Sequence, residues 1–214
     1  MKEEFKKPVI VGITGASGAI YWIRTIQHLL TNNYKLELVF SDSAIKVAKE
    51  ELGLELSSIP EIIKKQVLSY FNSQNISFNS ENLNVWAFND ISASISSGSY
   101  KTAGMIIIPA SMGTIASIAS GTSQNLITRA ADVCLKERRK IVVVPREMPL
   151  SSIHLENMLK LSTNGVIISP ACPGFYSKPK EINQLVDFVI GKVFDLFGIE
   201  HTLFTRWNKE KVCI

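Results

Sequence analysis

The sequence predicts an α/β protein in which helices cover both faces of a mostly parallel sheet. Two observations lead to this class. Apolar, β-branched runs alternate with amphipathic helical patterns along the whole chain, as in a series of βαβ units. Several runs, such as 105–108 and 141–144, are apolar throughout, which is typical of strands buried on both faces of a parallel sheet. We therefore expect a three-layer fold.

The first half of the chain contains three expected strands. The β-branched run 9–14 is followed at once by a helix over 20–30, in which isoleucine and leucine recur at helical spacing. The run 35–40 leads into a helix over 43–52. The polar stretch 54–82 holds a helical patch at 62–70, and 84–88 is a short strand before the Ser/Gly-rich loop 92–99.

The second half repeats the alternation. Strands are expected at 105–108, 141–144 and 166–168, and helices at 124–139, 152–161 and 180–197. Pro109 and Pro145 close the first two of these strands. Because no repeat and no boundary interrupts the pattern, we expect one domain over 1–214 with a C-terminal tail from about 198.

The composition narrows the function classes. The chain has 214 residues and a net charge of +4, but its basic residues form no stripe with interleaved aromatics, as nucleic-acid readers do. The densest basic cluster, 136–140, contains Glu137 and fits the last turn of a helix. The sequence has no signal-peptide core and no apolar stretch long enough to span a bilayer. We therefore expect a cytoplasmic protein with no nucleic-acid partner and no membrane span.

Metal and disulfide chemistry is not indicated. Cys134, Cys172 and Cys213 are far apart and form no C-x-x-C pair. Cys134 falls in a helical apolar pattern and is expected in the core, with thiols reduced. His28, His154 and His201 have no partner at metal or triad spacing. We expect structural roles for all three histidines and no bound metal.

Ligands of parallel sheets bind beyond the carboxyl ends of the strands. Four loops meet this condition, at 15–18, 41–43, 109–114 and 145–147. The small residues of 15–18 leave a helix N-terminus uncovered, which favours a phosphate. Their glycines match neither the dinucleotide fingerprint nor the triphosphate P-loop, so a mononucleotide phosphate is the better candidate. A tight turn with close helix packing is the alternative.

Polar residues near these loops have two interpretations each. Hydroxyls at Thr14, Ser17, Ser41, Ser43, Ser111 and Thr114 suit phosphate and ribityl oxygens, but hydroxyls are also ordinary in turns. Arg129 and Lys136 lie one heptad apart and would both bind an anion if their helix face met the loops. A surface ion pair is the alternative for Arg129.

Acidic and aromatic candidates complete the set. Glu147, after Arg146 at the end of a strand, is a proton-transfer group or part of a structural ion pair. Glu50 and Glu51 end a helix, where negative charge is unfavourable, which hints at a role. Tyr176 follows a sharp turn that would aim its ring at a ligand or bury it.

Several long motifs, in order along 9–207, resemble the UbiX-type flavin prenyltransferase family. They are Gly12–Ala19, Ser96–Ser99, Arg129–Arg139, Val144–Glu147, Ser151–Met158 and Pro173–Tyr176. The resemblance implies a Rossmann-like flavoprotein fold, reduced FMN as prenyl acceptor, and dimethylallyl phosphate as donor, with bonds formed at N5 and then C6. It also implies prenylated FMN for a UbiD-type decarboxylase, a place in ubiquinone biosynthesis, no metal, and a homododecamer.

The resemblance also assigns roles by position. Flavin contacts fall on Gly15, Ala16, Ser17, Ser41, Ser111, Met112, Gly113, Thr114 and Arg129. Dimethylallyl phosphate is assigned to Lys136, Arg146, Tyr176, Lys192 and Trp207, and catalysis to Glu147, Glu51, Ser17 and Lys136. Relatives often carry arginine where this chain has Lys192, so the charge is kept but the bidentate fork is lost.

Two other functions are considered. The first is an FMN-dependent decarboxylase acting on an aromatic acid such as 3-polyprenyl-4-hydroxybenzoate. Related peptidyl-cysteine decarboxylases carry a catalytic histidine after the second helix, and residues 43–99 contain no histidine. The second is a flavin carrier without turnover. Replacement of Glu147 would leave the FMN affinity of such a carrier unchanged.

Overall fold

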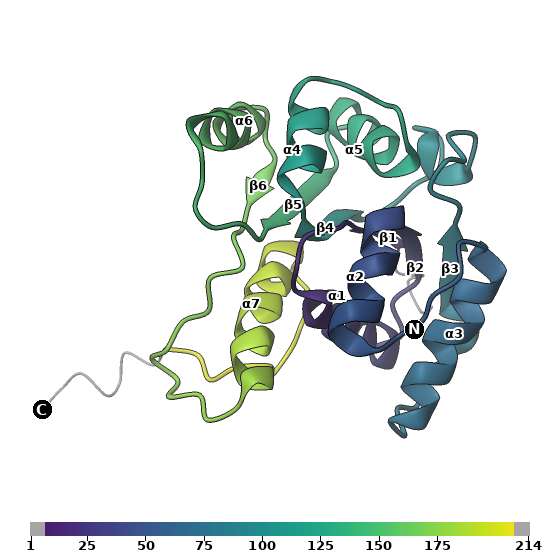
Figure 1. Ribbon diagram of the computed structural model, residues 1–214, viewed down its shortest axis with the longest axis vertical. Helices are drawn as coiled ribbons and strands as arrows, with labels where there is room; N and C mark the ends of the chain where they lie inside the picture. Colours follow the sequence, from purple (N-terminus) through teal and green to yellow (C-terminus); the bar gives the residue numbers. More distant parts are fainter. Residues whose placement is uncertain (1–6, 208–214) are drawn as a thin grey trace, which may run out of the picture. The chain divides into compact units, whose positions relative to one another are not determined.

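A computed structural model describes residues 7–207. They form two compact units, the first ending at Pro170 and the second beginning at Ala171. The first unit contains a six-stranded sheet in the order β3-β2-β1-β4-β5-β6 (Figure 1). Every neighbouring pair is parallel. The α/β fold class with a parallel sheet is thus confirmed.

The strands and helices of the first unit follow the expected alternation. The strands are β1 (Val9–Ile13), β2 (Leu36–Phe40), β3 (Leu83–Trp86), β4 (Gly104–Ala110), β5 (Lys140–Pro145) and β6 (Ile167–Ile168). The helices are α1 (Ala19–Thr31), α2 (Asp42–Leu52), α3 (Pro60–Ser73), α4 (Met112–Ala119), α5 (Leu126–Lys136) and α6 (Ser152–Thr163), with short 3-10 turns η1 (Ser80–Asn82) and η2 (Ser94–Ser96).

The strand order reverses between β1 and β4, which lie side by side at the centre of the sheet. From β1 the chain moves outward through β2 to β3, then returns to β4 and moves outward on the other side. In open α/β sheets, the crevice beyond the carboxyl ends at such a reversal is the usual ligand site. The fold therefore directs attention to the loops after β1 and β4.

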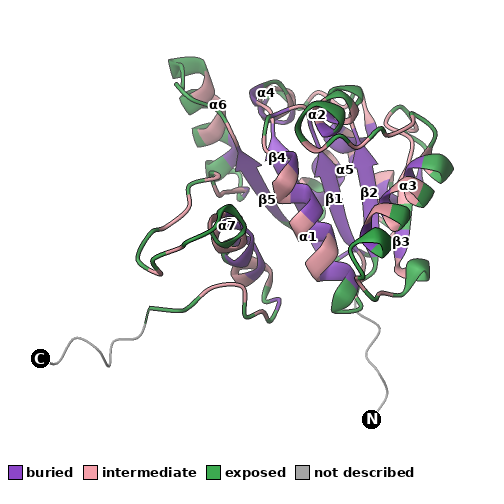
Figure 2. Ribbon diagram, turned by 60° about the horizontal axis from the view of Figure 1, so that its bottom comes forward, coloured by how far each residue is buried: buried purple, intermediate pink, exposed green. Residues whose placement is uncertain are grey.

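Both faces of the sheet are covered (Figure 2). Every residue of β1 and β4 is buried. On one face, Trp22 of α1 packs edge-on against Phe40 of β2, with ring centroids 5.2 Å apart. On the other, a Cβ at Gly12 would lie only 3.2 Å from Ile127 Cγ2 of α5, so this glycine lets α5 lie close to β1. Burial of apolar side chains in both layers drives the fold.

Two helices differ from the sequence-based expectation. The expected helix 124–139 is shorter, because it begins after the cap Asn125 and ends at Lys136. Helix α4 was not predicted, since its eight residues include Gly113 and three β-branched residues, which have lower helix propensity than alanine or leucine. Ser111 caps α4 by accepting a hydrogen bond from the Thr114 amide at 3.4 Å, and the helix is completed by burial of its apolar side.

The second unit contains α7 (Ile182–Phe197), and the chain after it folds back on this helix. A Cβ at Gly191 would lie 2.7 Å from His201 Cε1 and 2.5 Å from Phe204 Cε1. Asp195 binds Arg206 at 2.6 Å and His201 at 3.1 Å. The expected tail is thus ordered from 198 to 207, and its residues 208–214 lie outside the described residues. One domain over 1–214 stays a prediction.

Candidate active site

The loops after β1, β2, β4 and β5 meet at one edge of the sheet, as expected from parallel strands. Thr14 joins the first and third of these loops. Its hydroxyl donates to the carbonyl of Pro109 at 2.8 Å and accepts from the amide of Ser111 at 2.7 Å. Because Thr14 is only 2% exposed, these bonds fix the two central loops at the strand-order reversal.

The loop 15–18 after β1 is tightly packed. Gly15 has no room for a side chain, since a Cβ there would overlap Ser43 at the start of α2. Ala16 is buried and Ser17 is exposed. Gly18 adopts a left-handed backbone with φ of 110° at the N-cap of α1, a conformation that favours glycine. Packing therefore requires glycine at position 15, and backbone geometry favours it at position 18.

Glu51 covers the N-terminus of α1. Its carboxylate accepts from the amide of Gly18 at 2.9 Å and from that of Ala19 at 2.7 Å. The expectation that this helix end lies uncovered for a phosphate is therefore wrong. These contacts also explain why a negative charge is found near the end of α2, where it is unfavourable. The Glu51 carboxylate points away from the end of α2 and binds the positive end of α1. The flavin contacts at Gly15, Ala16 and Ser17 stay predictions.

Several groups keep Glu51 ionised. Partial burial pulls the pKa of Glu51 upward, but hydrogen bonds from the Ser17 hydroxyl and the Ala19 and Gly18 amides, with the charge of Arg146, hold that pKa below its ordinary value. Arg146 also donates from Nε to the Ser17 carbonyl at 3.0 Å. The structure thus brings Ser17, Glu51 and Arg146 together, as the site prediction requires.

The hydroxyls of Ser41 and Ser111 cap two more helices at this edge. Ser41 Oγ accepts from the Ala44 amide at 3.1 Å at the start of α2, and Ser111 Oγ lies 3.0 Å from Thr114 Oγ1 at the start of α4. Met112 is buried, whereas Gly113 is exposed with no atom within 4 Å of a built Cβ. The two hydroxyls therefore have the capping role that is ordinary in turns. At α4, the open space beside Gly113 also leaves the helix N-terminus accessible to a ligand.

Glu147 lies at the same edge but is exposed. Its carboxylate accepts from the Met148 amide at 3.1 Å. Arg146, next to it, turns toward Ser17 instead. The described contacts of Arg146 and Glu147 therefore do not form the structural ion pair that was one interpretation of these residues. The proton-transfer role of Glu147 stays a prediction.

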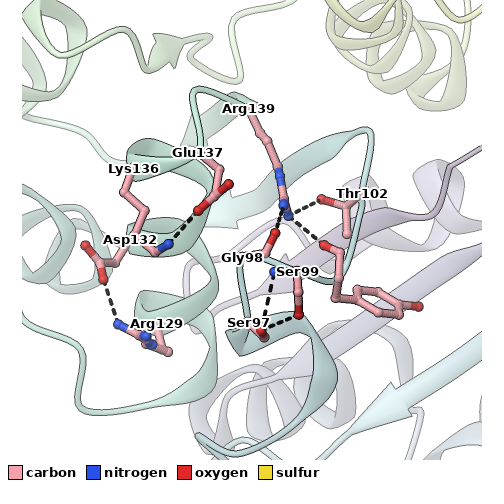
Figure 3. A network of polar contacts seen from close by, with 10 residues as sticks. Ser97, Gly98, Ser99, Thr102, Arg129, Asp132, Lys136, Glu137 and Arg139 are labelled. Atoms are coloured by element: carbon pink, nitrogen blue, oxygen red, sulfur yellow. Dashed lines mark hydrogen bonds and ion pairs between the residues drawn. The ribbon is translucent and has the colours of Figure 1, made fainter.

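The two candidate cations on α5 lie at opposite ends of that helix. Arg129 forms an ion pair with Asp132 at 2.9 Å, and Lys136 pairs with Glu137 at 2.6 Å (Figure 3). Lys136 ends α5 shortly before β5 begins, whereas Arg146 directly follows the end of β5. Since a six-residue strand spans roughly 17 Å, Lys136 lies at the amino edge of the sheet, far from Arg146 of the same chain.

Lys136 borders a separate hollow of about 490 Å³ between α4, α5 and α6, with Arg138 and Lys160. The condition that the face of Arg129 and Lys136 meets the carboxyl-edge loops is therefore not met by Lys136 within one chain, and the flavin contact of Arg129 stays a prediction. Whether Lys136 acts on the prenyl phosphate stays a prediction, and within one chain it does not join Arg146.

Three of the predicted substrate residues belong to the second unit. The rings of Tyr176 and Trp207 meet edge to face with centroids 5.3 Å apart, and Tyr176 also contacts Phe188 of α7 at 5.6 Å. Lys192 follows Phe188 by four residues, one helical turn further along α7. Trp207 is 66% exposed. The unit therefore presents an aromatic pair that the sequence spacing alone did not reveal.

The histidines have structural contacts. His154 completes a capping box with Ser151 at the start of α6. His201 accepts the Leu203 amide at Nδ1 and so donates from Nε2 to Asp195. Cys134 is buried, which raises the pKa of its thiol to about 11, as expected for a core residue. Within residues 7–207, no helix has the length and apolar character to cross a membrane.

Comparison with known proteins defines the class. The family described as Flavoprotein matches residues 1–194, and the chain belongs to this family. Flavin prenyltransferase UbiX of Alkalihalophilus pseudofirmus is 49% identical over 209 residues, covering 98% of this chain and 100% of the relative. That of Methanocaldococcus jannaschii is 43% identical, covering 94% and 98%. Among flavoproteins, the chain therefore belongs with the flavin prenyltransferases, and the predicted enzyme class is confirmed.

Two solved structures are similar over nearly the whole chain. AnUbiX (PadA1), in complex with FMN and dimethylallyl pyrophosphate, has a TM-score of 0.80 at 38% identity and covers 95% of this chain and 98% of its own. A dodecameric FMN-dependent UbiX-like decarboxylase from Escherichia coli O157:H7 has a TM-score of 0.80 at 41% identity, covering 94% and 99%. Both confirm the Rossmann-like flavoprotein fold.

Proposed function

We propose that this protein transfers the dimethylallyl group of dimethylallyl phosphate to N5 and then to C6 of reduced FMN, and that a UbiD-type decarboxylase receives the product. The observation that carries the proposal is the similarity to AnUbiX, a relative solved with FMN and dimethylallyl pyrophosphate together. The relatives named flavin prenyltransferase, at up to 49% identity, add support.

The residues at the carboxyl edge fit FMN. The loops after β2 and β4 offer the hydroxyls of Ser41 and Ser111 and the amide ends of α2 and α4, and Gly113 leaves open space beside them. Hydroxyls, amides and helix N-termini suit phosphate and ribityl oxygens. Since Glu51 already covers α1, we assign the FMN phosphate to the ends of α2 or α4, with Arg129 as a further flavin contact.

The remaining predicted residues have roles that follow from their chemistry. FMN supplies the nucleophilic nitrogen and carbon once it is bound in reduced form. Arg146 and Lys136 carry positive charge that neutralises the departing phosphate as the allylic C–O bond breaks, and Tyr176, Lys192 and Trp207 are assigned to the same donor. Aromatic faces stabilise a delocalised cation. Glu147 is assigned the proton transfers, with Glu51 and Ser17 beside Arg146.

We further propose that the protein works as a homo-oligomer, with twelve subunits as the expected number. Lys136 and Arg146 lie at opposite edges of the sheet, so a cavity that holds both needs more than one chain. Helix α6 also exposes Leu155 and Leu159, which are four residues apart on one face and each more than half accessible, and exposed apolar side chains that lie together often mark contact surfaces. A relative 41% identical to this chain is a dodecamer.

The test is anaerobic incubation with reduced FMN and dimethylallyl phosphate, followed by mass analysis of the flavin. We expect a flavin heavier by one prenyl unit, with inorganic phosphate released in equal amount. A parallel reaction with the diphosphate ester determines which donor is used. Unchanged flavin mass, with FMN bound to folded protein, would contradict the proposal.

Direct decarboxylation is the second candidate, because the E. coli relative is named a UbiX-like decarboxylase. Against it, residues 43–99 contain no histidine of the kind used by peptidyl-cysteine decarboxylases. Incubation of the FMN-bound protein with 3-polyprenyl-4-hydroxybenzoate separates the candidates. Release of carbon dioxide without any prenyl donor or second enzyme would favour the decarboxylase.

A further inference from the structure

The turn Ser97–Gly98–Ser99 belongs to a motif to which the proposed function gives no role. It lies directly beside Lys136 (Figure 3). A Cβ at Gly98 would lie 2.8 Å from Glu137 Cδ and 2.9 Å from Lys136 Nζ, so only glycine fits without a shift. The backbone of this turn therefore packs against the Lys136–Glu137 ion pair.

Arg139 binds the turn from the other side. Its guanidinium donates to the carbonyl oxygens of Gly98 at 2.5 Å and Tyr100 at 2.8 Å, and to Thr102 Oγ1 at 3.4 Å. A guanidinium holds its donors in a rigid planar fork, whereas a lysine ammonium is a single point on a flexible stem. One side chain thus fixes the Gly98 carbonyl in the turn and the Tyr100 carbonyl directly after it.

The end of α5 holds Arg139 and Lys136 in one fixed geometry. Arg138 has a left-handed backbone with φ of 54°. The amide of Arg138 donates to the carbonyl of Leu135 at 3.1 Å, and the amide of Arg139 to that of Cys134 at 2.8 Å. These two hydrogen bonds together define a Schellman motif at the C-terminus of the helix. Arg139 is therefore held beneath the turn while Lys136 lies against it.

Tyr100 gives the turn a second anchor in the sheet. Its hydroxyl donates to Glu37 at 2.6 Å, and Glu37, only 1% exposed, also accepts from Trp86 at 2.6 Å and Asn84 at 3.3 Å. Burial, with the nearby Glu37 carboxylate, raises the pKa of Tyr100 far above its ordinary value, so the phenol stays a donor. A buried carboxylate with several donors resists rearrangement.

We propose that Arg139 and Tyr100 are positioning residues that hold the Ser97–Ser99 turn against the Lys136–Glu137 pair and so determine where the Lys136 ammonium lies. Lysine is flexible, and confining it before an anion arrives lowers the entropy lost on binding. The link to the prenyl phosphate rests on the proposed function, but the confinement of Lys136 does not.

The first test needs no flavin. We would measure the rate at which acetic anhydride modifies Lys136 in the assembled protein, by peptide mass spectrometry. Arg139→Met should raise this rate severalfold, because the turn is released. Arg138→Asn is the matched control: it removes one positive charge from the same helix end, and asparagine tolerates its left-handed backbone. Equal Lys136 rates in the two variants would overturn the proposal.

The second test uses reduced FMN and dimethylallyl phosphate. Arg139→Met should raise the KM for the prenyl phosphate about tenfold, the range of one charge-assisted hydrogen bond, without changing the Kd for FMN. In a Lys136→Ala background it should have no further effect, since coupled residues are not additive. A full additional effect there would mean that Arg139 acts elsewhere, and the proposal would fail.

Tyr100→Phe keeps the ring and removes only the bond to Glu37, so it tests the proposal if Arg139→Met does not fold. Tyr100→Phe should raise both the Lys136 acetylation rate and the KM for the prenyl phosphate, but by less than Arg139→Met does. If neither quantity changes, Tyr100 is not a positioning residue. If the wild-type protein transfers no prenyl group, the proposed function fails, while the acetylation rates still decide the positioning role.

Discussion

At the scale of single residues, Glu51 is the clearest case of a side chain whose sequence position misleads. It ends α2, where a negative charge is unfavourable, yet its carboxylate binds the amides of Gly18 and Ala19 at the positive end of α1. The same carboxylate lies near Ser17 and Arg146. Glu51 therefore orders the loop 15–18 as well as capping a helix.

Replacing this carboxylate should weaken the fold measurably. Glu51→Gln should lower the free energy of unfolding by about 0.5–1 kcal/mol at pH 7, as for loss of a helix cap, measured by urea unfolding. The folded-state pKa of Glu51 lies below its ordinary value, so the contribution is full above the unfolded pKa and disappears as pH falls through the lowered folded value. The two proteins should thus converge in stability in acid.

Glu50→Gln serves as the control, because Glu50 is an exposed carboxylate at the same end of α2. It should leave the free energy of unfolding unchanged or slightly raise it. A loss equal to that of Glu51→Gln would show that net charge, not the cap on α1, stabilises the protein.

Substitution of Glu147 tests its proposed role in proton transfer. Glu147→Gln should keep the Kd for FMN and lower the rate of prenylated flavin formation by roughly 10²–10⁴-fold, the usual worth of a general acid or base. Anaerobic turnover followed by chromatography and mass analysis of the flavin measures this. An unchanged rate would remove Glu147 from the reaction, and a protein that binds FMN but gives no product even as wild type would be a flavin carrier.

At the scale of elements, glycines decide where segments approach each other. Gly12 lets α5 lie close to β1, and Gly191 lets the chain after α7 fold back on that helix. Neither role is visible in the local sequence, because each depends on a residue distant along the chain. In contrast, Gly113 meets no neighbouring atom within 4 Å of a built Cβ.

Gly191→Ala should therefore destabilise the second unit. Its Cβ would lie 2.7 Å from His201 Cε1, and overpacking of this kind costs typically about 1–3 kcal/mol. The measurement is urea unfolding together with Trp207 fluorescence, since Trp207 contacts Tyr176 in this unit. Gly113→Ala is the control for stability alone and should be neutral or mildly stabilising, because alanine favours helix.

At the scale of the whole molecule, the positions of the candidate residues support the proposal that the site is formed by more than one chain. Arg146, Glu147 and Ser17 lie at the carboxyl edge of the sheet, and Lys136 lies at the amino edge. Oligomers bring different surfaces of identical chains together. We therefore expect prenyl transfer to depend on assembly.

Leu159→Asp should disrupt that assembly. Leu159 is 65% exposed on α6, and a carboxylate there would be desolvated in any contact between subunits. Light scattering after gel filtration should give a smaller particle, and prenyl transfer should fall in proportion. Glu156→Lys, another exposed position on α6, is the control. A monomeric wild type that is fully active would contradict the oligomer proposal.

Local patterns in the sequence were sufficient for the fold class, most elements and the family. Apolar runs and helical spacing predicted β1, β4, β5 and α7 because their residues are buried on the faces that the periodicity indicates. The loops after four strands were expected at one edge because parallel strands require it. Helix α4 was missed because its stability comes from burial and from the Ser111 cap rather than from propensity.

Contacts between distant segments were beyond any local pattern. Glu51 reaches Gly18 across 33 positions of the chain, and Arg139 reaches Gly98 across 41. The separation of Lys136 from Arg146 by the length of β5 likewise appears only once the strand is placed between them. Periodicity records which face of an element is apolar, whereas the partner of a charged side chain depends on how whole elements pack, and that information is distributed over the entire chain.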